Sequence, residues 1–170
     1  MCLTVYDIDY YLDKDKTLKY KIAEKDLTFY KVVRLPKEKE GVHSQFVSPF
    51  LSSEINTYQM YEMDDYTVYE ICCHVLDISA GMIHLVSTLE DAYKLKDKMK
   101  LKDKYYNYEY CILNAIIPKG TKYIEGVFDW YLMDCQVNAV ATKKVFYTEV
   151  TPFQNWMESM MVNYGKYSKI

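Results

Sequence analysis

Residues 27–34 read Leu-Thr-Phe-Tyr-Lys-Val-Val-Arg, and this stretch decides the fold class. Branched and aromatic side chains dominate it, and Pro36 follows two residues later. This pattern is typical of a β-strand that stops at a turn. Two longer stretches of the same kind are YTVYEICCHVL at 66–76 and YYNYEYCILNAII at 105–117. Each predicts a long strand.

The strands are separated by short gaps. The strand at 105–117 ends at the turn residues Pro118-Lys119-Gly120-Thr121, and the chain resumes an extended pattern at 122–124. Shorter strands are expected at 3–8, 18–22, 43–48, 82–86 and 144–150. Many strands with short connections predict a mainly antiparallel, strongly twisted sheet or a partial barrel.

Two helices are expected beside this sheet. Ser87 and Glu90 form a capping box that predicts a helix over about 88–100. Pro152 at a first helical position, followed by an apolar stripe, predicts a second helix over 152–164. The fold class is therefore α+β, in one domain over 1–170. The second helix is expected either to close the core or to join a homodimer.

Composition excludes several classes of protein. Half of the 170 residues are apolar, and 21 basic against 24 acidic side chains give a net charge of −3. A net-acidic chain is a poor general binder of nucleic acid. No stretch is apolar enough for a membrane helix, and the first residues do not resemble a signal peptide, so a cytoplasmic protein is expected.

No metal or other cofactor is expected. The five cysteines are irregularly spaced, which indicates reduced thiols. The triplet Cys72-Cys73-His74 suggests a metal site, but neighbouring residues of a strand point to opposite faces.

The candidate ligand-binding residues are those suited to a phosphate or a base. Arg34 is the single arginine and hence the single side chain that can grip an anion with a guanidinium fork. His84 precedes a helix start, and Lys119 and Lys122 flank a turn whose amides are suited to an anion. The full predicted set is Tyr30, Arg34, Ser48, His84, Lys119, Thr121 and Lys122.

Three residues are candidates for catalysis. Cys2 would become an N-terminal nucleophile with its own base if Met1 were removed. His84 is suited to carrying a proton. Glu149 follows a predicted strand. Whether the protein is an enzyme stays open at this level.

Several blocks of the sequence resemble small uncharacterised proteins of gut Bacteroidota and their phages. They are the opening MCLT, FYKV at 29–32, the Gly81–His84 block, and IPKGTKY at 117–123. This resemblance implies an origin and no particular activity. The order of Arg34, Ser48 and Glu149 also resembles the broad layout of ADP-ribosyltransferase-like folds, at the level of fold analogy.

Three functions remain in competition. The first is binding of a small phosphorylated or nucleotide-like ligand, which a phage protein would use to sequester a host immune signal. The second is an enzyme that cleaves a nucleotide or uses NAD, or an N-terminal cysteine hydrolase. The third is an inhibitor of a host protein, which would use the acidic segment 40–93 or the helix at 152–164.

Overall fold

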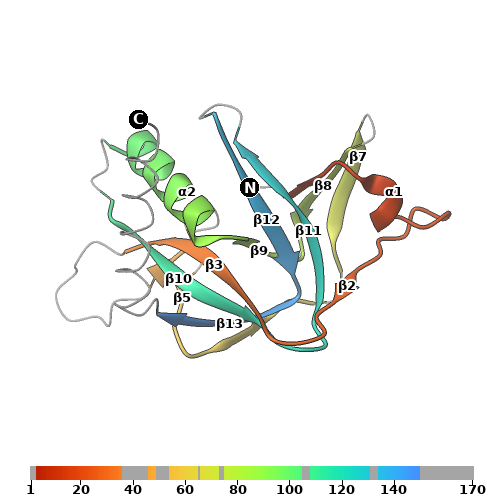
Figure 1. Ribbon diagram of the computed structural model, residues 1–170, viewed down its shortest axis with the longest axis horizontal. Coiled ribbons are helices and arrows are strands. Elements are labelled where there is room, and N and C mark those ends of the chain that lie inside the picture. Colours follow the sequence, from red (N-terminus) through yellow and green to blue (C-terminus); the bar gives the residue numbers. More distant parts are fainter. Residues whose placement is uncertain are drawn as a thin grey trace, which may run out of the picture.

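The computed structural model describes residues 3–35, 46–48, 54–64, 66–72, 75–104, 108–130 and 134–149, and its fold is α+β as predicted (Figure 1). In this part of the chain, thirteen strands form one open sheet in which every paired strand is antiparallel. The helices are α1 (Ile8–Tyr11) and α2 (Leu89–Lys102). The strands are β1 (Leu3–Val5), β2 (Lys21–Ile22), β3 (Leu27–Arg34), β4 (Phe46–Val47), β5 (Glu54–Ile55), β6 (Met60–Glu62), β7 (Val68–Cys72), β8 (Val75–Ala80), β9 (Ile83–Val86), β10 (Tyr110–Ile117), β11 (Lys122–Trp130), β12 (Cys135–Thr142) and β13 (Lys144–Glu149).

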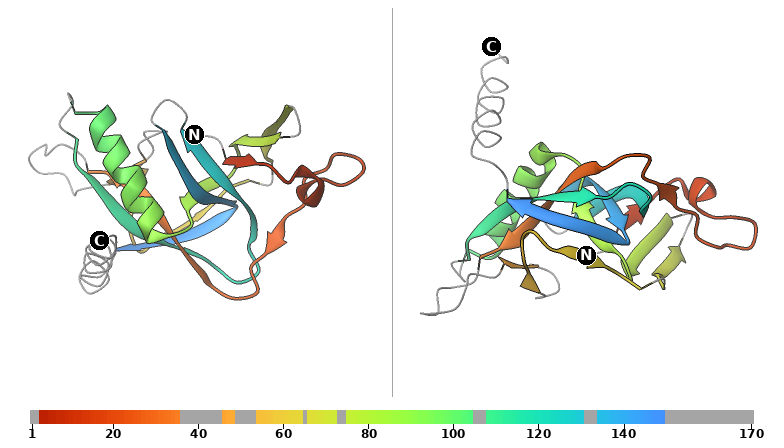
Figure 2. Two further views of the ribbon diagram at one scale, coloured as in Figure 1. Left: turned by 45° about the horizontal axis from the view of Figure 1, so that its top comes forward. Right: turned by 90° about the horizontal axis from the view of Figure 1, so that it is seen from below.

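The order of the strands brings β3 to the middle of the sheet. That order is β6-β13-β10-β3-β9-β12-β11-β1-β8-β7, with β2 beside β11, β4 beside β3 and β5 beside β4. Figure 2 shows how strongly the sheet is bent, with α2 on one side of the molecule and α1 on the other. The two ends of the order, β6 and β7, follow each other in the sequence and are separated by residues 63–67 alone.

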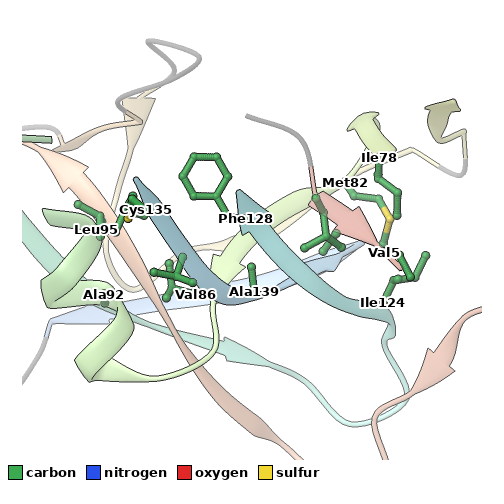
Figure 3. Packing of buried hydrophobic residues seen from close by; sticks show 14 of the residues in the cluster. Val5, Ile78, Met82, Val86, Ala92, Leu95, Ile124, Phe128, Cys135 and Ala139 are labelled. Carbon is green, nitrogen blue, oxygen red and sulfur yellow. The ribbon is translucent and has the colours of Figure 1, made fainter. Parts of the chain in front are cut away.

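The two faces of the sheet bury different clusters, because side chains alternate along each strand. On β3, Val32 belongs to the larger cluster, which α2 covers, and Val33 belongs to the smaller cluster on the opposite face. Figure 3 shows part of the larger cluster, including Ala92 and Leu95 of α2. Within the described ranges no helix is long and apolar enough to cross a membrane.

The start of α2 differs from the predicted capping box of Ser87 and Glu90. Thr88 is the N-cap, and its hydroxyl accepts a hydrogen bond from the Asp91 amide at 3.1 Å. Ser87 is still held to the sheet, because its amide donates to the Asn138 carbonyl at 2.9 Å. The helix therefore begins one residue later than the sequence pattern indicates.

The strand predictions need two main corrections, besides the short strands β5 and β6, which were not predicted, and β11, which continues to Trp130 past the predicted end at 124. The stretch 66–76 is not one strand, since β7 and β8 pair with each other and Cys72 lies opposite Val75. No glycine, proline or asparagine marks this reversal in the sequence. The second correction is β12, which was not predicted because its alanines and Asn138 have low strand propensity and packing decides its conformation. The predicted helix at 152–164 lies outside the described residues.

Candidate ligand-binding cavity

A cavity of about 410 Å³ lies on the face of the sheet that carries the smaller cluster. Its walls come from β3, β5, β6, β8, β9 and β13, together with Ser48, the connector between β6 and β7 and the turn between β8 and β9. Two exposed carboxylates, Glu54 and Glu62, lie on its rim, and Glu62 is paired with Lys144 at 3.0 Å. The described residues hold no group of three His, Cys, Asp or Glu side chains that could bind a metal ion.

Lys31 is a buried cationic side chain in the wall of this cavity. It lies in the middle of β3 with 9% of its surface exposed, on the same face as Val33. Its ammonium donates one hydrogen bond to a described residue, to the carbonyl of His84 at 2.8 Å. Burial lowers the pKa of Lys31 from 10.5 to about 8, with no opposing contribution from a carboxylate. The wall of the cavity therefore contains a desolvated amine, and some of its N–H donors have no hydrogen bond to a described residue.

Two buried hydroxyls line the same cavity. Ser48 is 3% exposed and Tyr147 is 2% exposed, and neither hydroxyl is hydrogen-bonded to a described residue. Burial raises the pKa of Tyr147, and the neighbouring Tyr61 raises it further, so the Tyr147 hydroxyl keeps its proton at neutral pH. The rings of Tyr61 and Tyr147 meet edge to face with centroids 5.4 Å apart. The cavity therefore has two hydroxyl donors and an aromatic wall in addition to the amine of Lys31.

A second buried lysine holds the wall of the cavity together. The Lys143 ammonium donates to the carbonyls of Asp64 and Tyr66, each at 2.7 Å, and to that of Gly81 at 2.8 Å. Tyr66 and Gly81 line the cavity. We call these four residues the lysine clamp. It fastens the connector between β6 and β7 to the turn between β8 and β9.

Two of the predicted ligand-binding residues line this cavity, Ser48 and His84. The contribution of His84 is its backbone carbonyl, which accepts from Lys31. Its ring lies on the other face of the sheet, because His84 pairs with Ala141 of β12 and Ala141 belongs to the larger cluster.

The other predicted cations lie at opposite ends of the β3–β10 pair. Arg34 is opposite Tyr110, and its guanidinium lies 4.3 Å from the centroid of the Tyr108 ring. The turn with Lys119 and Lys122 follows Ile117 at the other end of β10. Seven residue-to-residue steps along β10, from Tyr110 to Ile117, separate these ends, which is about 24 Å at 3.4 Å per step. The structure therefore does not bring Arg34 and this turn into one site.

The turn at 118–121 uses its own amides within the protein. The Lys119 amide donates to the Asp26 carboxylate at 2.8 Å, and the Gly120 amide donates to the Ala23 carbonyl at 2.7 Å. The amide of the buried Thr121 donates to the Pro118 carbonyl at 3.1 Å. These amides are therefore already engaged, and the turn offers an anion only the exposed side chains of Lys119 and Lys122.

The remaining candidates lie apart from the cavity. Tyr30 packs on the larger cluster, on the face of β3 opposite Lys31. Glu149 is exposed at the end of β13, and its carbonyl accepts from the Asn114 side chain at 3.2 Å. Cys2 lies outside the described residues.

The sequence analysis did not select Lys31, Tyr61 or Tyr147. A signal for Lys31 is present in the sequence: within 27–34 it shares one strand face with Phe29 and Val33, which places a lysine where a core residue is expected. Tyr147 lies at an inward position of the predicted strand 144–150, but nothing in the sequence indicates that its hydroxyl meets a cavity.

Comparison of the chain with models of protein families, with curated proteins and with solved structures gave no significant match.

Proposed function

We propose that this protein binds a small phosphorylated or nucleotide-like ligand in the cavity beside Lys31. The observation that supports the proposal most is a buried ammonium with one hydrogen bond to the described residues and no carboxylate acting on it. A buried cation without a counter-charge is costly, and an anion placed beside it would remove much of that cost.

The shape and lining of the cavity support the same class of ligand. A volume of about 410 Å³ lies at the lower end of the range for small-molecule pockets, about 300–1,000 Å³. This size favours a single phosphorylated sugar or nucleoside over a dinucleotide. The Ser48 and Tyr147 hydroxyls would donate to phosphate oxygens, and the Tyr61–Tyr147 pair offers a ring edge to a base. In the setting that the sequence resemblance implies, such binding would sequester a host signal.

Thermal melting with inorganic phosphate and a panel of nucleoside monophosphates tests this proposal. A ligand at a hundredfold excess over its Kd should stabilise the protein by about 2.7 kcal/mol, or roughly 5–10 °C. Lys31→Met should abolish the shift. Lys119→Met is the matched control, because Lys119 is exposed in the predicted phosphate-binding turn, and it should leave the shift unchanged. A shift that survives Lys31→Met would overturn the cavity as the site, as would the absence of any shift across the panel.

The pH dependence of binding gives a second test. The ammonium form of Lys31 is the form that an anion favours, and its pKa in the free protein is about 8. Affinity should therefore be highest below this pH and fall as the pH rises through it, because the neutral amine has lost its charge. Recovery of the ligand with its mass unchanged identifies a binder, whereas an altered mass identifies an enzyme.

A further inference from the structure

Lys31 differs in its surroundings from three other lysines that have defined partners. Lys143 is equally buried, but three carbonyls occupy its ammonium at 2.7–2.8 Å. Lys21 and Lys144 are partly exposed and are held by Glu125 at 2.5 Å and Glu62 at 3.0 Å. Each of these partners accepts a hydrogen bond from the ammonium group and so occupies the nitrogen.

The nitrogen of Lys31 has one hydrogen bond to a described residue. It donates to the His84 carbonyl at 2.8 Å, and the lysine lines the cavity. Because burial favours the neutral amine, a lone pair is available near neutral pH. A desolvated lysine in the wall of a cavity is a usual arrangement for nucleophilic attack on a carbonyl carbon.

The cavity also offers a proton donor for the oxygen of such a carbonyl group. Tyr147 and Ser48 line it with hydroxyls that have no partner among the described residues, and Tyr147 is fully protonated near neutral pH. A nucleophile and hydroxyl donors that line one cavity are the groups that carbinolamine formation and dehydration need.

We propose that Lys31 captures a small aldehyde or 2-oxo acid as a covalent, reversible imine in this cavity. The amine lone pair forms a C–N bond to the carbonyl carbon while the carbonyl oxygen takes up a proton. The resulting carbinolamine releases that oxygen as water. The two protons of the amine nitrogen leave and replace those that the oxygen took up, and the nitrogen forms a double bond to carbon. One amine and one carbonyl compound give one imine and one water, with no oxidation or reduction. The protonated imine remains a cation, so it still attracts a carboxylate or phosphate group on the same ligand. This inference rests on the proposed binding function.

Reductive trapping on the wild-type protein tests the inference. The protein is incubated with glyoxylate, which is an aldehyde with a carboxylate, in the presence of sodium cyanoborohydride near pH 8. Trapping adds one carboxymethyl group per modified lysine, and peptide mass spectrometry locates it. Lys31 should be modified about tenfold or more faster than Lys119 and Lys144, because burial lowers the pKa of Lys31 to about 8 and leaves much of its amine neutral at this pH. Inorganic phosphate should protect Lys31 and leave Lys119 unaffected.

The outcomes separate this inference from the proposed function. Modification spread over exposed lysines without enrichment at Lys31 overturns imine capture. If phosphate still raises the melting temperature in a Lys31-dependent way, the binding function stands without it. If neither trapping nor a phosphate shift depends on Lys31, both proposals fail. Because the mapping uses wild-type protein, the test does not depend on whether Lys31→Met folds.

Discussion

Lys31 and Lys143 are both buried, with 9% and 7% of their surfaces exposed, yet their surroundings differ in one decisive respect. The lysine clamp gives Lys143 three carbonyl acceptors from two separate segments. Lys31 has one carbonyl acceptor among the described residues and a cavity beside it. A buried ammonium stabilises a fold when backbone acceptors surround it and destabilises the fold when they do not. The comparison therefore assigns Lys143 to stability, and it supports the proposal that Lys31 binds a ligand.

The largest expected effect is the loss of the lysine clamp. Lys143→Met removes the donor to three carbonyls and should lower the free energy of unfolding by about 3–4 kcal/mol, measured by urea denaturation. Lys144→Met is the matched control, since its partner Glu62 is exposed, and it should cost less than about 1 kcal/mol. Equal losses in the two variants would remove the distinction on which the comparison depends.

Gly81→Ala should disrupt the same clamp from the other side. Gly81 has a φ of +78°, and a Cβ there would lie 2.2 Å from the Tyr66 carbonyl oxygen, another member of the clamp. We expect a loss of about 3 kcal/mol in unfolding free energy, from strain and displacement of that carbonyl.

Gly120→Ala separates the two contributions to this loss. Gly120 also has a positive φ, +82°, but its Cβ would meet nothing within 4 Å. It should therefore show the backbone strain alone, about 1–2 kcal/mol. Similar losses at both glycines would mean that the close approach of Gly81 to Tyr66 contributes little to stability.

Lys31→Met should raise the free energy of unfolding, whereas the substitutions above lower it. A pKa of about 8 in the folded protein against 10.5 when unfolded corresponds to roughly 3 kcal/mol of destabilisation at neutral pH. The hydrogen bond to His84 offsets about 1 kcal/mol of this, so the variant should be about 2 kcal/mol more stable than the wild type at pH 7.

The stability difference between Lys31→Met and the wild type should depend on pH. Between pH 8 and 10.5 the unfolded chain binds more protons at Lys31 than the folded chain does, so wild-type stability gains a contribution as the pH rises. The stability gained by Lys31→Met over the wild type should therefore decrease between pH 8 and 10.5, as measured by urea denaturation of both proteins. An advantage that stays constant would contradict the depressed pKa.

Tyr147→Phe should have the smallest effect on stability. Its hydroxyl makes no hydrogen bond to a described residue, so the unfolding free energy should change by less than about 0.5 kcal/mol. Ligand affinity should still fall, because the hydroxyl lines the cavity. Calorimetric titration and urea denaturation of the same variant test both statements, and a large loss of stability would show that the hydroxyl has a structural partner.

The sequence predicts the fold class because its strongest patterns are local. The strand at 27–34 and the helix near 88–100 follow from side-chain type and capping chemistry, and the structure has both as β3 and α2. The reversal between Cys72 and Val75 and the strand β12 depend on partners distant in sequence. Local propensity does not contain that information.

The candidate site is predicted less well for the same reason. Ser48 and His84 were selected and line the cavity, while Arg34 and Lys119 belong to opposite ends of one antiparallel pair. Only the register between β3 and β10 shows that separation. Lys31 could have been selected from the sequence, because a lysine between Phe29 and Val33 on one strand face departs from the apolar pattern of a core.

The lysine clamp also has a consequence for the order of folding. Its acceptors lie between β6 and β7 and between β8 and β9, and its donor lies between β12 and β13, so three distant parts of the chain must be in place before it forms. Because bringing distant parts of the chain together carries a loop-closure cost, we expect this contact to form after the folding transition state. The clamp should therefore slow unfolding rather than accelerate folding, and it sets how long the cavity wall persists once formed.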